Sequence, residues 1–199
     1  MSHSANFLQS NLDCWFCQAP IEASHLTCPE CASLQEPAAM DHFQRLFLSV
    51  QYELEMAQLE RAYFEEQAKV HPDQFVGKTD REKNCAVAHS SCVNEAYAIL
   101  KDPLKRAQHF LAIKGIDTTE AGDSLRDVEL LEEMMIWNEK VHESASREGI
   151  DHELRLKIEK GFSTLSRTLS GSDLPQAVKI IYRLKYYTKL LDDFSLRKH

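Results

Sequence analysis

Residues 62–78 read AYFEEQAKVHPDQFVGK, and this stretch decides the fold. Its first part closes a run of apolar residues spaced three to four apart, which predicts an amphipathic helix from about residue 53. The helix has to end at Val70 or His71, because Pro72 disfavours helical backbone in the residue before it. Since the residues up to Lys78 are mostly polar, the stretch predicts a helix that runs into a polar loop.

A second long helix is predicted directly after this loop. Thr79 or Asp80 is a suitable N-cap, and Pro103 is expected to begin a shorter helix that Gly115 ends. The inner face of the long helix is expected to hold Ala86, Val93, Ala96, Tyr97 and Leu100. Upstream, Asp41 is a suitable cap for a short helix. The central part of the chain therefore predicts a helical hairpin with short flanking helices.

The composition narrows the class of protein. The chain has 199 residues with 31 acidic and 23 basic side chains, a formal charge of −8. No apolar run approaches the ~20 residues of a membrane span, and a net negative chain is a poor default binder of nucleic acid. Six glycines and six prolines are few for a turn-rich all-β fold. We therefore expect a mostly α protein with neither a membrane nor a nucleic acid as partner.

Three longer helices are predicted after a loop at 116–126. They cover about 127–148, where Gly149 ends the first, then 151–169 and 173–194. Their apolar stripes are expected to meet in a three-helix bundle. The stripes are Leu131, Met134, Met135, Trp137 and Val141; Leu154, Ile158, Phe162 and Leu165; Val178, Ile181, Leu184 and Leu190. Residues 116–154 carry twelve acidic and three basic side chains, and residues 155–199 carry four and ten, which favours antiparallel packing.

Four cysteines near the N-terminus form two C-x-x-C pairs, Cys14 with Cys17 and Cys28 with Cys31. Two such pairs joined by a short loop can bring four thiolates around one tetrahedral ion. Zn²⁺ is the expected occupant, although iron also accepts four sulfurs. A closed four-sulfur site indicates a structural metal. Because this polar segment has little core of its own, the metal should supply much of its folding energy.

The cysteines allow other interpretations, which the sequence disfavours. Two disulfides would need an oxidising compartment, and nothing in the chain signals export. A redox dithiol needs one C-x-x-C pair and usually a βαβ pattern, which is missing. His25 is expected at the surface, because four sulfurs complete the ligand set. Cys85 and Cys92 lie too far apart along one helix for a disulfide and are expected to be buried or half-buried free thiols.

The tripeptide His71-Pro72-Asp73 is informative because predicted helices flank it on both sides. The second helix continues into VNEAYAILKDPLKRA over residues 93–107. This pairing resembles a J domain, in which the tripeptide lies at the tip of an antiparallel helical hairpin. The resemblance implies that Pro72 stiffens the loop and leaves His71 and Asp73 to bond with the ATPase domain of a heat-shock-70-type chaperone. Lys69 is expected to add to this chaperone-binding face.

The rest of the chain resembles the HscB family, co-chaperones of iron–sulfur cluster assembly, over residues 41–199. The resemblance includes LLEEMM at 130–135 and RLKYY at 183–187. The tetracysteine segment resembles the extension of animal and plant mitochondrial members. We therefore expect three domains: a metal-binding segment at 1–40, a J domain at 41–115 and a three-helix bundle at 116–199 that binds the cluster scaffold.

The resemblance implies an adaptor that is not an enzyme. Such an adaptor brings a scaffold protein of the IscU type to a chaperone of the HscA type and stimulates ATP hydrolysis, which aids cluster transfer. The resemblance places the scaffold-binding face at Leu131, Met135, Glu139 and Tyr186. Bottom-up, these residues also suit the bundle core, and for Met135 both placements stay open. The six apolar residues among 130–137 exceed what one interface needs, which is consistent with an exposed docking patch.

The helix before the tripeptide departs from the usual J-domain pattern. It is acidic where J domains show a basic face, of which only Arg61 and Lys69 remain. Glu66 occupies a position that is commonly Leu, and Gln74 replaces the Lys that often follows the tripeptide.

Two other functions are weighed against the adaptor. A general J-protein for unfolded clients would favour a Gly/Phe-rich linker and β domains, and the sequence has neither. A metal-dependent redox or transfer protein would need an open ligand position at the cysteines. A homodimer formed through the N-terminal segment stays open. The expected location is the cytoplasm of a bacterium, or the mitochondrial matrix if a presequence has been removed.

Overall fold

The computed structural model describes residues 11–22, 24–118, 128–143, 147–171 and 173–196. The chain divides into two compact units, residues 1–50 with 54–101 and residues 51–53 with 102–199. Helices dominate the described residues, and the strands there lie only in the cysteine segment. The predicted mostly α fold with a small tetracysteine segment is therefore confirmed. None of the described helices has the length and apolar character needed to cross a membrane.

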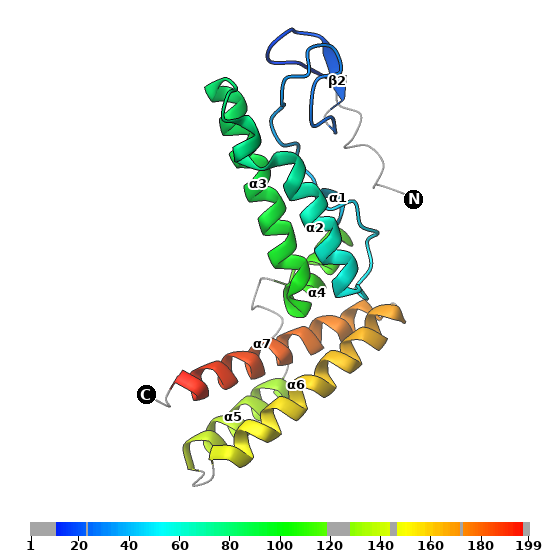
Figure 1. Ribbon diagram of the computed structural model, residues 1–199. Coiled ribbons are helices and arrows are strands. Elements are labelled where there is room, and N and C mark those ends of the chain that lie inside the picture. Colours follow the sequence, from blue (N-terminus) through cyan, green and yellow to red (C-terminus); the bar gives the residue numbers. More distant parts are fainter. Residues whose placement is uncertain (1–10, 23, 119–127, 144–146, 172, 197–199) are drawn as a thin grey trace. The chain divides into compact units, whose positions relative to one another are not determined.

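The helical hairpin of the first unit forms as the sequence predicts. Figure 1 shows its two long helices side by side, with a short 3₁₀ turn between them. The elements are α1 His42–Arg45, α2 Met56–Val70, η1 Pro72–Phe75 and α3 Asp80–Lys101. Its core consists of Phe43, Leu46, Leu59, Val70, Val93, Ala96 and Leu100. Asp41 caps α1 by accepting the N–H groups of Phe43 and Gln44 at 2.8 and 3.0 Å.

The cysteine segment of the first unit contains a small antiparallel hairpin. Strand β1 Asn11–Asp13 pairs with β2 Pro20–Glu22, with Leu12 opposite Ile21. A further bridge joins Thr27 to Leu34. The buried apolar residues of this segment include few large side chains, so the segment has little core of its own, as the sequence indicates.

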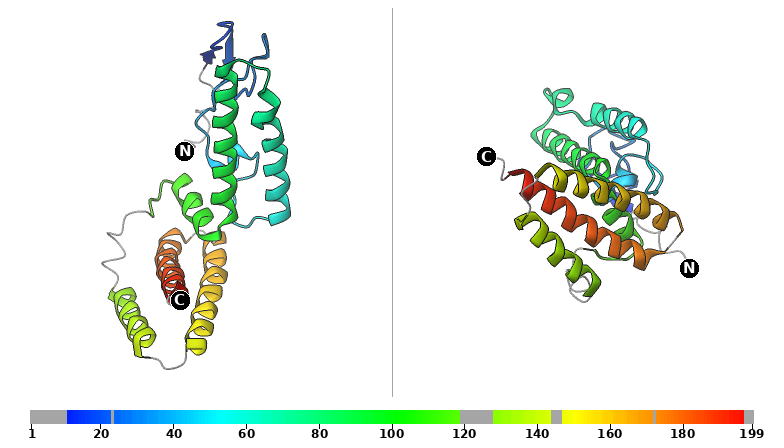
Figure 2. Two further views of the ribbon diagram at one scale, coloured as in Figure 1. Left: turned by 60° about the vertical axis from the view of Figure 1, so that its left-hand side comes forward. Right: turned by 90° about the horizontal axis from the view of Figure 1, so that it is seen from below.

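The second unit is built on a helical hairpin of α6 and α7, which run antiparallel (Figure 2). Its helices are α4 Pro103–Ile113, α5 Val128–Glu143, α6 Arg147–Ser170 and α7 Leu174–Leu196. At Gly161 a Cβ would lie 2.6 Å from a methyl group of Leu184, so the absent side chain permits close packing of α6 against α7. Helix α4 packs on α7, and α5 adds Trp137 to a second cluster.

Helix α4 belongs to the compact unit that contains the bundle, although the sequence places it within residues 41–115. Its buried residues Ala107, Phe110 and Leu111 cluster with Ile181 and Leu184 of α7. The three predicted domain boundaries stay a prediction.

One predicted detail of the bundle is wrong. Helix α6 begins at Arg147, so Gly149 lies inside this helix and does not end α5. The reason is burial, because Ile150 and Leu154 need helical spacing to reach Trp137 together. For Leu131 and Met135 the sequence left core and surface placements open, and in the structure both are exposed while Leu130 is buried.

Candidate metal centre and partner-binding faces

The two C-x-x-C pairs form turns of the same kind. The N–H of Gln18 donates to the carbonyl of Cys14, and the N–H of Ala32 donates to that of Cys28, both at 2.9 Å. Gln18 and Ala32 both adopt the left-handed backbone region, with φ of 63° and 57°. This conformation costs roughly 1–2 kcal/mol for a residue with a side chain. In both turns the residue with this conformation directly follows the second cysteine of the pair.

The four sulfur atoms lie where a tetrahedral ion would hold them. The Sγ atoms of Cys14 and Cys31 are 3.7 Å apart, and so are those of Cys17 and Cys28. All four lie within 4.8 Å of one another. Sulfurs about 2.3 Å from a central zinc in a tetrahedron lie about 3.8 Å apart, so the donor set fits. The six cysteines are free, and Cys85 is buried and Cys92 half-buried, as predicted.

The electrostatics of the thiols favours a cation among them. Although burial opposes the shift, the backbone N–H groups of Cys17 and Phe16 and the Ser33 hydroxyl lower the pKa of the Cys14 thiol to about 5. The N–H of Ala19 also favours the Cys17 thiolate, but desolvation and the other sulfurs raise the pKa of Cys17 to about 12. Four thiolates at this spacing repel one another, and a divalent ion removes the repulsion.

Polar groups surround the sulfurs. Gln35 Nε2 donates to Cys14 Sγ at 3.4 Å and to the Ser33 hydroxyl at 2.8 Å. Ser33 Oγ lies 3.1 Å from Cys31 Sγ. His25 is exposed, as expected. Because hydrogen bonds to thiolates orient and stabilise ligands, Ser33 and Gln35 suit a metal centre, and the spacing of the cysteines gave no sign of them.

The His71–Asp73 loop presents two polar side chains on a rigid turn. Pro72 begins η1, and the His71 and Asp73 side chains are 50% and 88% exposed. His71 Nδ1 accepts the backbone N–H of Asp73 at 3.3 Å. That bond requires an unprotonated Nδ1, so the neutral ring carries its proton on Nε2. The loop therefore offers a donor on His71 beside a carboxylate acceptor on Asp73.

Gln74 has a role that the sequence pattern did not reveal. Its side-chain amide donates to the carbonyl of Ala68 in the last turn of α2. Its backbone N–H donates to the carbonyl of His71 at 3.0 Å. Gln74 therefore ties the loop to the end of α2, using a carbonyl that lacks a partner within the helix.

Lys69 is engaged within the chain itself. Its ammonium lies 2.5 Å from the Glu66 carboxylate and 5.5 Å from the centre of the Phe47 ring. The side chain of Glu66 is mostly buried, whereas that of Lys69 is half exposed. Glu66, at a position that is commonly apolar, thus holds one of the few basic groups of α2.

The predicted scaffold-binding residues of α5 share one outward face. Met135 is 65% exposed and Leu131 36%, and Glu139 is exposed one turn further on. Val128, also strongly exposed, extends the face by one turn, although its position in the sequence gave no sign of this. Exposure of these apolar side chains resolves the open placement of Met135, because it does not lie in the core. Apolar side chains in a row at the surface are typical of protein-binding sites.

Tyr186 and Glu133 support α5 from behind. Tyr186 is half-buried, and its hydroxyl donates to the carbonyl of Met134 at 2.8 Å, next to Met135. Glu133, which no local sequence pattern marks, accepts hydrogen bonds from Lys157 at 2.5 Å and from Arg183 at 3.2 Å. The structure thus brings Tyr186 to α5 as an anchor of the helix, behind Leu131 and Met135, and its role in scaffold binding stays a prediction.

The chain matches two protein-family models. The model of the DnaJ domain matches residues 41–109, and that of the HSCB C-terminal oligomerisation domain matches residues 126–195.

Curated relatives match over most of the chain. A co-chaperone protein HscB homolog of Shewanella loihica is 34% identical over 161 residues, 76% of this chain and 93% of the relative. The human iron–sulfur cluster co-chaperone protein HscB is 29% identical over 192 residues, 93% of this chain and 82% of the relative.

Solved structures match in the same way. The crystal structure of human HscB covers 94% of this chain and 98% of its own, with a TM-score of 0.85 and 29% identity. HscB from Vibrio cholerae covers 79% and 97%, with a TM-score of 0.73 and 27% identity. Given a DnaJ domain, a matching C-terminal domain and relatives aligned over nearly their whole length, the chain belongs to the HscB family of J-domain co-chaperones.

Proposed function

We propose that this chain recruits an iron–sulfur cluster scaffold protein of the IscU type to a heat-shock-70-type chaperone of the HscA type and stimulates its ATP hydrolysis. The human relative is named for iron–sulfur clusters, which supports the substrate class. The observation that carries the proposal is the presence of two unlike binding faces on one chain. One is the polar His71–Asp73 loop, and the other is the apolar face of α5.

The loop suits a partner that supplies both an acceptor and a donor. The His71 ring donates from Nε2, and the Asp73 carboxylate accepts. Pro72 restricts the conformations of the free loop, so the loop loses less conformational entropy when it binds a partner. Lys69 contributes positive charge to the same end of α2. These residues form the proposed chaperone-binding site.

The proposed scaffold-binding site consists of Leu131, Met135, Glu139 and Tyr186, to which we add Val128. Apolar side chains supply affinity by burial on association. The carboxylate of Glu139 adds a charge at the rim, where it selects the partner and the orientation. The chain then acts by bringing scaffold and chaperone together, with no catalytic residue of its own.

We further propose that Cys14, Cys17, Cys28 and Cys31 bind one structural Zn²⁺. The fit of the sulfur separations and the closed ligand set support a metal without an open position. Elemental analysis should give about one zinc per chain. Cys28→Ser should lower that content, whereas Cys92→Ser, a half-buried cysteine outside the cluster, should not. Iron in place of zinc would reassign the metal.

The ATPase rate of the cognate chaperone, with and without this protein and with scaffold added, tests the proposed function. The protein should raise the rate, and scaffold should raise it further. His71→Gln should return the rate to its basal value, because the flexible amide lacks the ring whose Nδ1 bond to the Asp73 N–H fixes the direction of the Nε2 donor. His152→Gln is the matched control, since His152 is an exposed histidine of α6. Undiminished stimulation by His71→Gln would refute the chaperone-binding assignment.

A further inference from the structure

We propose that the four-cysteine centre positions the His71–Asp73 loop through Leu34, so that metal binding at the cysteines keeps the J domain competent for its chaperone. The inference rests on the proposed function for the role of the loop. It concerns contacts within the first compact unit, and these contacts run from the sulfurs to the loop in three steps.

The first step ties Leu34 to both cysteine turns. The carbonyl of Leu34 accepts the indole N–H of Trp15, inside the first turn, at 2.7 Å. The residue before it, Ser33, accepts the N–H of Cys28 on its carbonyl at 2.9 Å. The Ser33 hydroxyl also lies near the sulfurs of Cys14 and Cys31. The position of Leu34 therefore depends on the closure of both turns.

The second step carries Leu34 to the loop. Its side chain is 1% exposed and forms a cluster with Cys85 and Ala86 of α3. Phe75, the last residue of η1, packs against this cluster. Phe75 follows Asp73 by two residues, and Leu34 helps to bury its side chain. The packing of Phe75 therefore anchors the turn that presents His71 and Asp73. Cys85 is therefore a buried thiol with apolar neighbours.

The third step fixes the start of α3 beside the loop. The Glu82 carboxylate, which is buried, accepts hydrogen bonds from the Thr79 N–H and hydroxyl at 3.1 and 2.9 Å. Although burial opposes the shift, the Thr79 hydroxyl first, and then the Thr79 N–H, the Lys78 charge and the Leu34 N–H, hold the pKa of Glu82 below its usual range. Thr79 and Glu82 thus form a capping box at the start of α3, directly after the loop, and the Leu34 side chain packs with Phe75 beside it.

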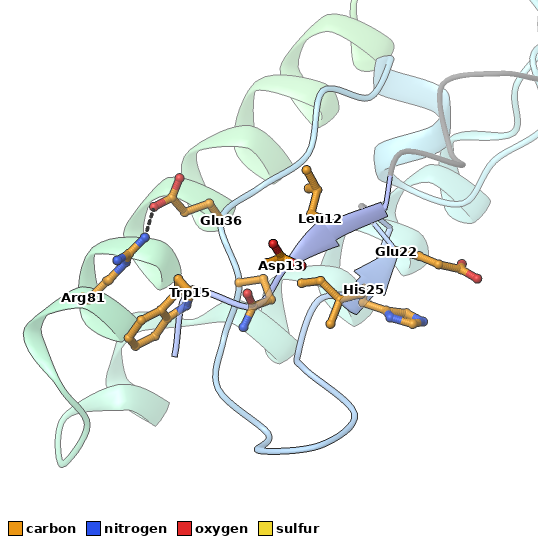
Figure 3. A pocket seen from close by; sticks show the side chains of 9 residues that line it. Leu12, Asp13, Trp15, Glu22, His25, Glu36 and Arg81 are labelled. Atoms are coloured by element: carbon orange, nitrogen blue, oxygen red, sulfur yellow. Dashed lines mark hydrogen bonds and ion pairs between the residues drawn. The ribbon is translucent and has the colours of Figure 1, made fainter. Parts of the chain in front are cut away.

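Two further contacts attach the segment to the same face of α3. The guanidinium of Arg81 stacks over the Trp15 ring at 4.6 Å and pairs with Glu36 at 3.1 Å, as Figure 3 shows at the edge of a pocket of about 190 Å³. One turn beyond Cys85, His89 Nε2 lies 3.0 Å from the carbonyl of Gln35. Residues 81, 85 and 89 are spaced by four, so they share one helix face.

The cysteine segment has no large core to hold Leu34 without the ion. Its own buried cluster is Cys14, Ile21 and Cys28, two of which are ligands. Loss of the metal should therefore open the turns and release Leu34. Phe75 then loses its packing contact with Leu34, and the loop between α2 and α3 should fluctuate more widely. The helices of the second unit share no residue with this cluster.

Amide hydrogen exchange of the full chain tests the inference directly. Chelation of the metal should speed exchange over residues 73–86 by about tenfold or more and leave α5–α7 unchanged. Adding Zn²⁺ back should reverse the change, which separates opening of the loop from irreversible unfolding. Unchanged exchange over residues 73–86 after complete metal removal would overturn the inference.

Leu34→Ala tests the contact without removing a ligand. It should keep about one metal per chain and still speed exchange over residues 73–86. The control is Leu12→Ala in the same segment, because Leu12 is 50% exposed and should leave exchange unchanged. Wild-type exchange in Leu34→Ala with full metal would contradict the role of Leu34. If the variant loses its metal, the chelation experiment on the unmodified chain decides whether the metal centre positions the loop.

The ATPase readout separates this inference from the proposed function. Chelation and Leu34→Ala should both lower stimulation of the chaperone, and Leu12→Ala should not. Absence of stimulation by the unmodified chain would refute the proposed function, while the exchange result would still decide whether the metal centre positions the loop. Faster loop exchange with full stimulation would refute the functional part of the inference alone.

Discussion

The two proposed binding faces are assembled in opposite ways. The hydrogen bonds that fix the backbone of the His71–Asp73 loop come from near neighbours in the chain, since His71 Nδ1 accepts the N–H of Asp73 and the Gln74 side-chain amide donates to the carbonyl of Ala68. The Leu34 cluster adds apolar packing through Phe75. The α5 face is held by residues far along the chain. Glu133 bonds Lys157, 24 residues away, and Arg183, 50 residues away, and Tyr186 bonds the carbonyl of Met134 across 52 residues.

The difference follows from what each face has to do. A polar loop that gives direction to hydrogen bonds needs a fixed backbone, which a proline and a short turn supply locally. A face that leaves Leu131 and Met135 in water cannot bury those side chains to hold its own helix in place. Helix α5 is therefore held by its other side, through the buried Trp137 and Leu130 and through polar contacts. The two faces should respond independently to mutation.

The largest expected effect is on the apolar face. Leu131→Ala with Met135→Ala should weaken scaffold binding by about 30- to 700-fold, because each truncation removes about 1–2 kcal/mol of apolar burial. Titration calorimetry measures this loss. Since both side chains are exposed, thermal stability should change little.

The control for this pair is Leu156→Ala, because Leu156 is an exposed apolar residue of α6. It should leave scaffold affinity unchanged. Chaperone stimulation in the absence of scaffold should also be unaffected by Leu131→Ala with Met135→Ala. A parallel loss of that stimulation would break the proposed independence of the two faces.

The next effect concerns the support of α5. Glu133→Gln keeps the shape of the side chain but loses the charge that binds Lys157 and Arg183. Charged hydrogen bonds contribute about 1.5–3 kcal/mol each at most, so we expect scaffold affinity to fall by about threefold to tenfold and the melting temperature to fall by a few degrees. Glu132→Gln, at an exposed neighbour, is the control. Equal affinities of the two variants would contradict a supporting role.

The same carboxylate predicts a pH dependence. Although burial opposes the shift, hydrogen bonds from Lys157 and Tyr187 and the charges of Lys157 and Arg183 lower the pKa of Glu133 from its ordinary 4.5. A lowered pKa means that this stabilisation is present above pH 4.5 and is lost as the pH falls through the folded-state value. The stability difference between wild type and Glu133→Gln should therefore shrink in acid. A difference that grows in acid would refute this prediction.

The contrast between the faces also explains what could be predicted from the sequence. The cysteine spacing and the tripeptide between two amphipathic helices are local patterns, and the sulfur cluster and the hairpin follow from them. The exposure of Met135 and the role of Glu133 depend on residues that the chain brings from α6 and α7, which no local period specifies. The helix end predicted at Gly149 is wrong for the same reason. The burial of Ile150 and Leu154 against Trp137 outweighs the local tendency of glycine to end a helix.

The smallest expected effect concerns the basic residue beside the loop. The Glu66 carboxylate lies 2.5 Å from the Lys69 ammonium, so a partner that binds Lys69 has to displace it. Because the Lys69 side chain is half exposed, we expect the pair to contribute as a surface pair does, about 0.2–1 kcal/mol. Glu66→Gln should therefore lower the concentration for half-maximal chaperone stimulation by about twofold to threefold. Scaffold affinity should not change, because this pair lies in the other compact unit.

Net charge has to be separated from release of Lys69, since Glu66→Gln also removes one negative charge. Glu65→Gln makes the same change at an exposed neighbour and is the matched control. An advantage of Glu66→Gln over Glu65→Gln, largest at low salt, would indicate that Lys69 itself meets the chaperone. Equal effects would mean that only the charge of α2 matters, and they would remove Lys69 from the chaperone-binding site.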